Sequence, residues 1–286
     1  MARKSIREAA AEQRPLVTPL AHDALTARMI AKAGFKAMGI GGSAMLAARY
    51  GLPDIGIAAL GEMAAGTKDI MDASDLPIVV DGDDGYGDIK SVARMTDTYV
   101  RMGVGAIVLE DQERSEKRPG DAKASSVASI PAMQEKIRVA VSRCQGSETM
   151  IIARSDAYGL EGLDGILRRA EDYVEAGAAG FLVVGVTNLD ELEQIGRRLG
   201  HVHLATPIFE GRPNWRPPAE YGEMGFRQVM YPGLLITRVV DALERGLEGL
   251  GGFAQGKSLE PLERRVPAAE LLAEIVGLAD WQGLRS

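Results

Sequence analysis

The chain has 286 residues, 46% of them apolar, a length that suits one α/β barrel domain of about 250 residues. Its formal net charge of −7 argues against nucleic acid as a partner, because an acidic protein gains nothing from releasing the counterions condensed on phosphates. The single cysteine excludes an intramolecular disulfide and fits a reducing cytoplasm, and no apolar run is long enough for a secretory signal or a membrane span.

Short apolar runs and amphipathic segments alternate along the chain. The runs predicted to be strands are 16–20, 37–40, 78–80, 106–109, 150–153, 181–184, 202–205 and 228–231. Apolar residues recur at helical spacing in 24–33, 91–102, 132–142, 165–176 and 190–199. Continuously apolar strands indicate a parallel sheet that helices cover on both faces. Eight such units favour a closed (β/α)8 TIM barrel over the alternative, an open doubly wound sheet.

The C-terminal part exceeds what an eight-unit barrel needs. Residues 241–250 predict a helix, Gly251 and Gly252 a turn, and 267–278 a further helix. No linker or low-complexity tract divides the chain, so we expect a single domain over 1–286. Surplus terminal helices of barrels often pack on a neighbouring subunit. We therefore expect residues 241–286 to contact a second copy in a homo-oligomer, either a tetramer or a dimer of dimers.

Acidic side chains follow two neighbouring predicted strands. Asp81 and Asp83 come directly after the third strand, and Glu110 follows the fourth. The carboxyl ends of barrel strands meet at one mouth, so these three carboxylates should converge there. Such a cluster needs a cation, and oxygen ligands without His or Cys select Mg²⁺, or Mn²⁺, over Zn²⁺. Arg154, after the fifth strand, should face the metal and hold a small anionic substrate.

Each of these patterns also has a purely structural interpretation. Asp and Gly favour turns for local reasons, so residues 81–87 (DGDDGYG) could be a simple glycine-rich turn. Gly41, Gly42 and Ser43 could form either a tight turn or a backbone nest for a carboxylate. The metal interpretation is favoured because three carboxylates and an arginine stand at the ends of three successive strands.

Together these motifs resemble the isocitrate lyase/phosphoenolpyruvate mutase superfamily. The most specific match is residues 81–87, similar to the D-A-D-x-G-Y-G of that family. Supporting matches are Gly42-Ser43, Pro53-Asp54, 109–112, 153–157 and 229–232. The resemblance covers nearly the whole chain. It implies a barrel, Mg²⁺, an enolpyruvate-like intermediate and usually a tetramer of helix-swapped dimers.

The resemblance also implies roles for individual residues. Asp83 resembles the principal metal ligand, and Asp81 and Glu110 resemble ligands that act largely through water. Ser43 resembles the residue that holds the substrate carboxylate, and Arg154 resembles the substrate arginine. The remaining matches are Asp54, an acid near the metal and substrate, and Tyr86, part of the same loop wall.

The loop after the fourth strand departs from the family pattern. The lyase branches carry K-R-C-G-H there, with the Cys as proton donor, and here Lys117, Arg118 and Gly120 fit that pattern. Pro119 stands at the Cys position and Asp121 at the His position. Proline has no ionisable group, so it cannot be a general acid. The oxaloacetate decarboxylase-like branch also lacks the Cys, and residues 41–43 and 181–186 of this chain resemble that branch. That branch, however, carries a His where this chain has Gly233.

These observations predict a cytoplasmic, Mg²⁺-dependent lyase that acts on a small 2-oxo or 2-hydroxy carboxylate through an enolate. Decarboxylation of oxaloacetate or a similar acid comes first, because it needs no general base to start. The first alternative is retro-aldol cleavage of a 2-methylisocitrate or substituted malate, with Lys117 or Asp121 as the acid. The others are carbon–phosphorus chemistry on a phosphonopyruvate-like compound and a non-catalytic carboxylate binder. No nucleic acid or membrane partner is expected.

Overall fold

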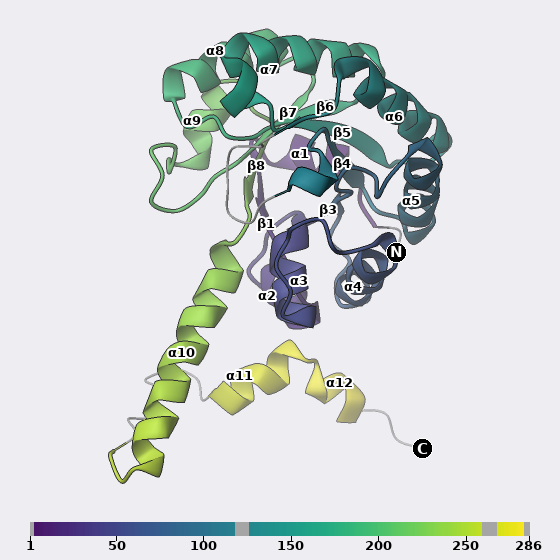
Figure 1. Cartoon of the computed structure of the whole chain (residues 1–286). Coiled ribbons are helices and arrows are strands. Elements are labelled where there is room, and N and C mark those ends of the chain that lie inside the picture. Colours follow the sequence, from purple (N-terminus) through teal and green to yellow (C-terminus); the bar gives the residue numbers. More distant parts are fainter. Residues whose placement is uncertain (1–2, 118–125, 259–267, 283–286) are drawn as a thin grey trace.

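The computed structural model describes residues 3–117, 126–258 and 268–282, and its centre is a barrel of parallel strands (Figure 1). The strands are β1 (Leu16–Pro19), β2 (Met38–Ile40), β3 (Ile78–Asp81), β4 (Ala106–Glu110), β5 (Met150–Ser155), β6 (Gly180–Val183), β7 (His203–Pro207) and β8 (Gln228–Tyr231). Their order is β1-β8-β7-β6-β5-β4-β3-β2. A single bridge between Leu20 and Gly39 brings β1 beside β2, so the sheet is nearly closed. This confirms the predicted barrel.

Helices surround the strands. They are α1 (Ile6–Glu12), α2 (Ala24–Lys32), α3 (Gly42–Tyr50), α4 (Leu60–Asp72), α5 (Ile89–Met102), α6 (Ile130–Arg143), α7 (Tyr158–Glu175), α8 (Leu189–Leu199), α9 (Pro218–Glu223), α10 (Leu234–Ala254), α11 (Ala268–Ile275), α12 (Leu278–Gln282) and the 3₁₀ turn η1 (Arg114–Glu116). Local sequence sets their limits. Asp88 caps α5 by accepting from the backbone N–H groups of Lys90 and Ser91, and Gly103 ends the helix with φ 78°.

Successive side chains of each strand point to opposite faces of the barrel wall, so two hydrophobic clusters form, one between strands and helices and one inside the barrel. Ile107 and Leu109, the odd-numbered residues of β4, pack outward against the helices. Ala106 and Val108 pack inward, in a smaller cluster with residues of the neighbouring strands. Because successive side chains point to opposite faces, Glu110 continues the inward set of β4. The same alternation in β5 turns Arg154 inward, directly beside Glu110 in the register of the two strands.

The C-terminal helices differ from the prediction. The turn expected at Gly251 and Gly252 is wrong, because α10 begins at Leu234 and continues through both glycines to Ala254. Glycine costs a helix about 1 kcal/mol relative to alanine, which is too little to end a long helix by itself. Figure 1 shows α10 projecting away from the barrel, and none of its residues is buried. Within the described ranges, no helix is long and apolar enough to cross a membrane.

Candidate active site

The loop after β3 is fixed by its own backbone. Asp81 ends β3, and its carboxylate accepts from the backbone N–H of Asp83 at 3.0 Å and from that of Gly42 at 3.3 Å. Asp83 and Tyr86 both have a positive φ, of 52° and 60°, which is uncommon outside glycine. A side chain at Gly82 would meet the Val108 carbonyl oxygen at 2.7 Å. The glycine-rich turn is therefore real, and it also aims acids into the barrel mouth.

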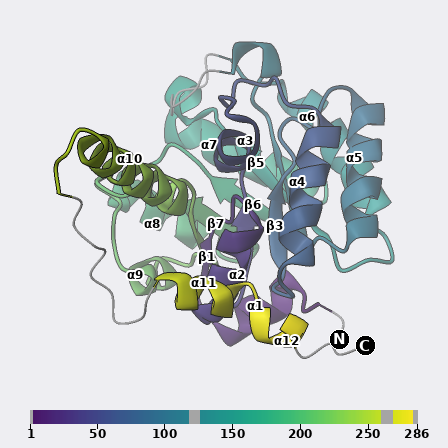
Figure 2. The ribbon, with the colours of Figure 1, turned by 90° about the horizontal axis from the view of Figure 1, so that it is seen from below.

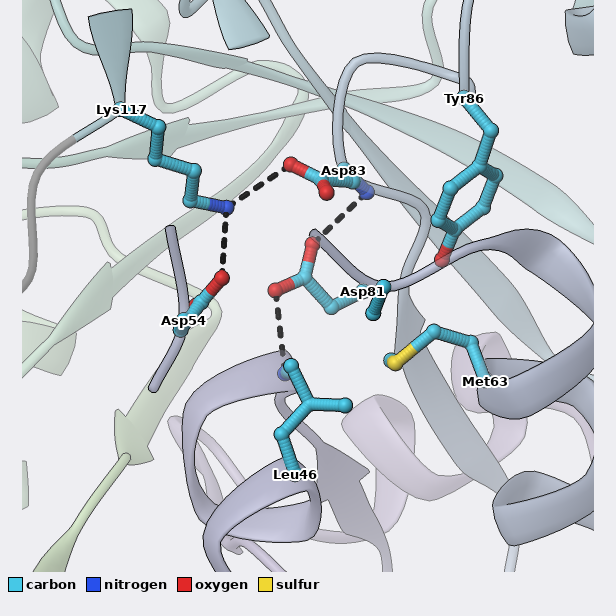
Figure 3. A pocket seen from close by; sticks show the side chains of 9 residues that line it. Leu46, Asp54, Met63, Asp81, Asp83, Tyr86 and Lys117 are labelled. Carbon is cyan, nitrogen blue, oxygen red and sulfur yellow. Dashed lines mark hydrogen bonds and ion pairs between the residues drawn. The ribbon is translucent and has the colours of Figure 1, made fainter. Parts of the chain in front are cut away.

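Three carboxylates converge on one ammonium group. The Lys117 Nζ lies 2.8 Å from Asp83 Oδ1, 3.2 Å from Asp54 Oδ1 and 3.2 Å from Glu110 Oε1 (Figure 3 shows the first two contacts). The Lys117 side chain is 8% exposed and that of Glu110 only 1%. The carboxylates come from the β3 and β4 ends and from the loop after α3. The chain therefore supplies its own cation to the acidic cluster.

Burial and mutual charge set the protonation of this cluster. Burial raises the pKa of Glu110 well above its ordinary value, although Arg154 and Lys117 favour the charged form. Burial opposes the charge on Lys117, but Glu110, Asp81 and Asp83 outweigh it and raise the Lys117 pKa. Burial acts to raise the pKa of Asp83 too, but Lys117, a hydrogen bond with Glu110 and the charge of Arg114 together outweigh it, so the pKa is lowered. Lys117 therefore stays protonated, and Asp83 is ionised.

Arg154 lies on the other side of Glu110. Its guanidinium contacts Glu110 Oε2 at 2.7 Å and Asp156 Oδ1 at 2.8 Å. Within the described residues, the buried Arg154 Nε and Asp156 Oδ2 have no hydrogen-bond partner. An unsatisfied buried donor is costly unless something binds it. The mouth thus contains one guanidinium with a free N–H, which an incoming carboxylate could use.

A second network holds the Arg154 end of the site. Asp111 accepts from Ser155 Oγ and Tyr173 OH, both at 2.7 Å, and from Arg169 at 3.1 Å. Its other oxygen accepts from the backbone N–H of Asp156 at 3.0 Å. Sequence reasoning missed this network, because its members lie far apart in the chain with no motif that joins them. It fixes the β5 end that carries Arg154.

Arg114 is a further residue that the sequence prediction missed. Its guanidinium lies 2.8 Å from Asp83 Oδ2 and 3.0 Å from Asp84 Oδ1, and it stands over the Tyr86 ring at 5.3 Å. A basic residue in η1, soon after the acids that end β4, was the available signal. Arg114 thus holds the loop after β3 through Asp83, Asp84 and Tyr86.

The donor chemistry suits a hard divalent cation. Asp81, Asp83, Glu110 and Asp54 offer only oxygen atoms, which is what Mg²⁺ and Mn²⁺ prefer. In the described ranges, however, no group of three or more Asp, Glu, His or Cys residues is arranged to hold a metal ion. The ammonium of Lys117 lies among these oxygens instead. Metal binding by Asp81, Asp83 and Glu110 remains a prediction.

The other predicted site residues divide into three groups. Gly42, Asp54, Tyr86 and Lys117 line one small pocket with Asp81 and Asp83. Gly41 is the N-cap of α3, and Ser43, in its first turn, is exposed with no contact to that pocket. Asp121 and Pro119 lie outside the described residues.

Known proteins are similar to this chain both in sequence and in fold. Residues 6–250 match the phosphoenolpyruvate phosphomutase family. The 2-methylisocitrate lyase of Bacillus subtilis is 34% identical over 230 residues, covering 80% of this chain and 75% of that protein. The 2,3-dimethylmalate lyase of Eubacterium barkeri is 33% identical over 227 residues, covering 79% and 78%. Oxaloacetate acetylhydrolase bound to the inhibitor 3,3-difluorooxalacetate superposes with a TM-score of 0.88 at 26% identity, covering 98% and 94%. The chain therefore belongs to the PEP mutase/isocitrate lyase superfamily.

Proposed function

We propose that this protein is a metal-dependent carbon–carbon lyase for a small 2-oxo or 2-hydroxy dicarboxylate, and that its reaction is decarboxylation of oxaloacetate or a similar 2-oxo acid. The observation that carries the proposal is the barrel mouth itself. Arg154 presents an unpartnered buried N–H beside Glu110, and Lys117 adds a second cation among the acids. The free N–H of Arg154 can bind one substrate carboxylate, and a metal held by the acids would attract the rest of the anion.

The chain's own residues have distinct tasks in this reaction. Arg154 binds a substrate carboxylate and fixes its orientation, and the backbone at the start of α3, at Gly41 and Gly42, faces the same mouth. Asp83, with Asp81 and Glu110, would hold Mg²⁺ or Mn²⁺, which when bound supplies a Lewis acid for the 2-oxo group. The distal carboxylate leaves as CO₂, and its bonding electrons form the enolate of pyruvate. A proton from solvent then completes pyruvate, so no thiol is required.

Retro-aldol cleavage is a second candidate, favoured by the names of two relatives. Both 2-methylisocitrate lyase and 2,3-dimethylmalate lyase are named for substituted dicarboxylates. In this reaction the substrate hydroxyl loses a proton as the carbon–carbon bond breaks, and the enolate fragment gains one. Lys117 and Asp121 are the candidates for that second transfer. Carbon–phosphorus chemistry and simple carboxylate binding complete the alternatives.

A product-resolved assay separates these reactions. Purified protein is incubated with oxaloacetate, 2-methylisocitrate, 2,3-dimethylmalate or phosphonopyruvate, with MgCl₂ or EDTA. Decarboxylation gives pyruvate and CO₂ alone, retro-aldol cleavage gives two organic fragments, hydrolysis of oxaloacetate gives oxalate, and phosphorus chemistry changes the ³¹P spectrum. We expect metal-dependent pyruvate formation from oxaloacetate, above the metal-only background.

Two variants test whether the acids of the mouth carry the activity. Asp83→Asn should abolish turnover, whereas Asp72→Asn, an exposed acid of α4, should leave it unchanged. Pyruvate formation that is equal in Asp83→Asn and the unaltered protein would refute the assigned site. No excess of pyruvate over the metal-only background would refute oxaloacetate decarboxylation, and two organic fragments from a substituted malate would favour the second candidate.

We also propose that α10, α11 and α12 pack on a second copy of the chain, α11 in addition to its contact with α2 of its own chain, where Arg28 donates to the Ile275 carbonyl oxygen. Val240, Leu243, Leu247, Leu250 and Phe253 are all exposed on α10. Exposed apolar patches of this kind mark protein–protein contacts. The partner is a second copy because a projecting helix can pack on its own equivalent about a twofold axis.

A further inference from the structure

A second cavity opens at the opposite end of the barrel from the candidate active site. Its volume is about 490 Å³, and it is lined by the N-terminal ends of β5 to β8 and by α1. Figure 2 shows α1 at the lower end of the barrel, whereas α3 lies toward the upper end. Along β5, Met150 lines this cavity and Arg154 reaches the active site, so about 13 Å of strand separates the two ends.

The charged side chains that line the cavity are all basic. They are Arg7, Arg14 and Arg227, accompanied by His201 and His203. No aspartate or glutamate is among the described lining residues, in a protein whose net charge is −7. The rest of the lining is small and apolar, mainly alanine. A concentration of one sign of charge around a hollow creates a potential that attracts the opposite charge.

None of these three arginines contacts a carboxylate within the part of the chain that the structure describes. Within the described ranges, the side chains of Arg7 and Arg14 make no hydrogen bond or ion pair. Arg227 donates one long bond, of 3.3 Å, to the Gly200 carbonyl oxygen and has no carboxylate partner. Most other arginines of the barrel, Arg169 for example, contact at least one acid. The three guanidiniums therefore retain most of their hydrogen-bonding capacity.

His203, which lines the cavity, is close enough to Arg227 and Arg7 for their positive charges to act on its ring. It is buried, and its Nε2 pairs with Gln228 Oε1 at 2.9 Å. Burial lowers the pKa of His203, and the charges of Arg227 and Arg7 lower it further. Arg7 belongs to α1 and Arg227 directly precedes β8, so two separate elements place positive charge at the same point. An anion bound between these two elements would offset their positive charge.

We propose that this cavity is a binding site for a small multivalent anion, either a di- or tricarboxylate or a phosphorylated compound. A volume of about 490 Å³ lies in the range of small-molecule sites. Arginine suits both carboxylate and phosphate because its planar fork binds their oxygens in pairs. The bound anion bridges α1 and the start of β8. Since Ile6 and Ala9 of α1 pack into the interior cluster of the barrel, the anion stabilises the closed lower end.

Calorimetric titration of the metal-free full chain tests the site. The probes are pyrophosphate and citrate at constant ionic strength, with sodium chloride as the monovalent reference. We expect one anion per chain, and at least tenfold weaker binding in Arg7→Gln/Arg227→Gln. The matched control is Arg101→Gln/Arg197→Gln, which removes two exposed arginines from α5 and α8 and should bind like the unaltered protein. Tighter binding of pyrophosphate assigns the site to phosphorylated compounds, and tighter binding of citrate assigns it to carboxylates.

Two further measurements keep the result specific to this cavity. Arg154→Gln should retain binding, because Arg154 lies at the other end of β5. Arg14→Gln, a single change at an exposed residue, should weaken binding even if the double variant folds poorly. The proposal is overturned if neither probe binds, if the Arg7/Arg227 variant binds with unchanged affinity, or if binding disappears only in Arg154→Gln.

Discussion

The central feature at the residue scale is a lysine that lies where the acids of the barrel mouth meet. Asp83, Asp54 and Glu110 would repel one another strongly if they were left together in a buried site. Lys117 relieves that repulsion with contacts of 2.8 to 3.2 Å to all three. A divalent cation held by the same acids would perform the same electrostatic task. Lys117 and Mg²⁺ therefore offer alternative sources of positive charge for one cluster.

This equivalence gives a stability prediction for Lys117→Met. Removing one partner from a buried ion pair typically costs about 3 kcal/mol or more, because the remaining charges lose their counter-charge. We expect the free energy of unfolding to fall by about 3 kcal/mol in EDTA and to recover substantially in MgCl₂. The unaltered protein, which retains its lysine, should respond less to Mg²⁺. Urea denaturation with and without metal measures both effects.

The control for this experiment is Lys68→Met. Lys68 pairs with Asp72 on the surface of α4 at 2.5 Å, and both side chains are exposed. Such surface pairs contribute little to stability, so this variant should unfold like the original in either buffer. If Lys117→Met had the same stability in EDTA and in MgCl₂, the exchange between lysine and metal would be refuted.

The sequence predicted part of this site because strand ends obey simple geometry. Asp81, Glu110 and Arg154 terminate neighbouring parallel strands, so their convergence follows from barrel topology. The position of the Lys117 side chain does not follow, since it depends on the path of a loop. Arg169 and Tyr173 were missed for another reason. Both lie on the buried face of α7, where the helical pattern indicates packing and gives no sign of a polar network with Asp111.

At the scale of elements, apolar runs and helical spacing predicted the eight strands and the helices α2, α5, α6, α7 and α8, but not α1, α4 or α9. The helix α3 was not predicted either, because it begins with Gly42 after Gly41, residues that favour turns. In the structure this start lies against the acidic cluster, and the backbone N–H of Gly42 donates to Asp81. The local sequence at Gly41 and Gly42 therefore gives little preference for a helix. The contact of Gly42 with Asp81 forms only once the barrel brings α3 beside the end of β3.

A buried polar chain joins three strands at the lower half of the barrel. His203 of β7 pairs with Gln228 of β8 at 2.9 Å, and Gln228 donates to Thr18 of β1 at 2.8 Å. All three side chains are buried. Because two of these strands are far from the third in sequence, the chain ties the last units of the barrel to the first. The histidine is the one titratable side chain of the three.

Burial lowers the pKa of His203 below its usual value, so the folded protein binds the proton less readily than the unfolded chain. The contribution of neutral His203 to the free energy of unfolding is therefore fully present above about pH 6.5, the usual histidine pKa in an unfolded chain. It is lost as the pH falls toward and through the lower pKa of the folded protein. We expect the free energy of unfolding, measured with urea, to decrease between about pH 7 and pH 5.5. His203→Gln should make this dependence shallower. His22, whose pKa burial also lowers, leaves a residual slope. An equally steep slope in His203→Gln would contradict the assignment.

At the scale of the whole molecule, the barrel and the C-terminal helices obey different rules. The barrel buries its apolar residues within one chain, and its architecture could be derived from the order of strand and helix patterns. The helix α10 does not bury its apolar residues in this way. Its sequence pattern predicts a helix but does not identify the surface that would cover its apolar side. The extent of α10 was also mispredicted, because local glycines were given more weight than its apolar stripe.

The apolar stripe of α10 leads to a prediction about assembly. Val240, Leu243, Leu247 and Leu250 repeat at helical spacing, and each is between 54% and 67% exposed. Fully burying such a side chain contributes about 1.5–3 kcal/mol, so covering the exposed part of these four on both copies favours association. Sedimentation velocity should show an oligomer for the unaltered chain and a shift toward monomer for Leu243→Lys/Leu247→Lys.

The control changes the polar side of the same helix. Asp241→Lys/Glu248→Lys introduces two lysines away from the stripe and should leave the assembly intact. If the unaltered protein sedimented as a monomer at every concentration, the stripe would not be a contact between copies. If both double variants dissociated equally, charge rather than loss of the apolar face would explain the effect. Dissociation confined to Leu243→Lys/Leu247→Lys would mean that α10 completes its core only with a second chain, unlike the barrel, which completes its core alone.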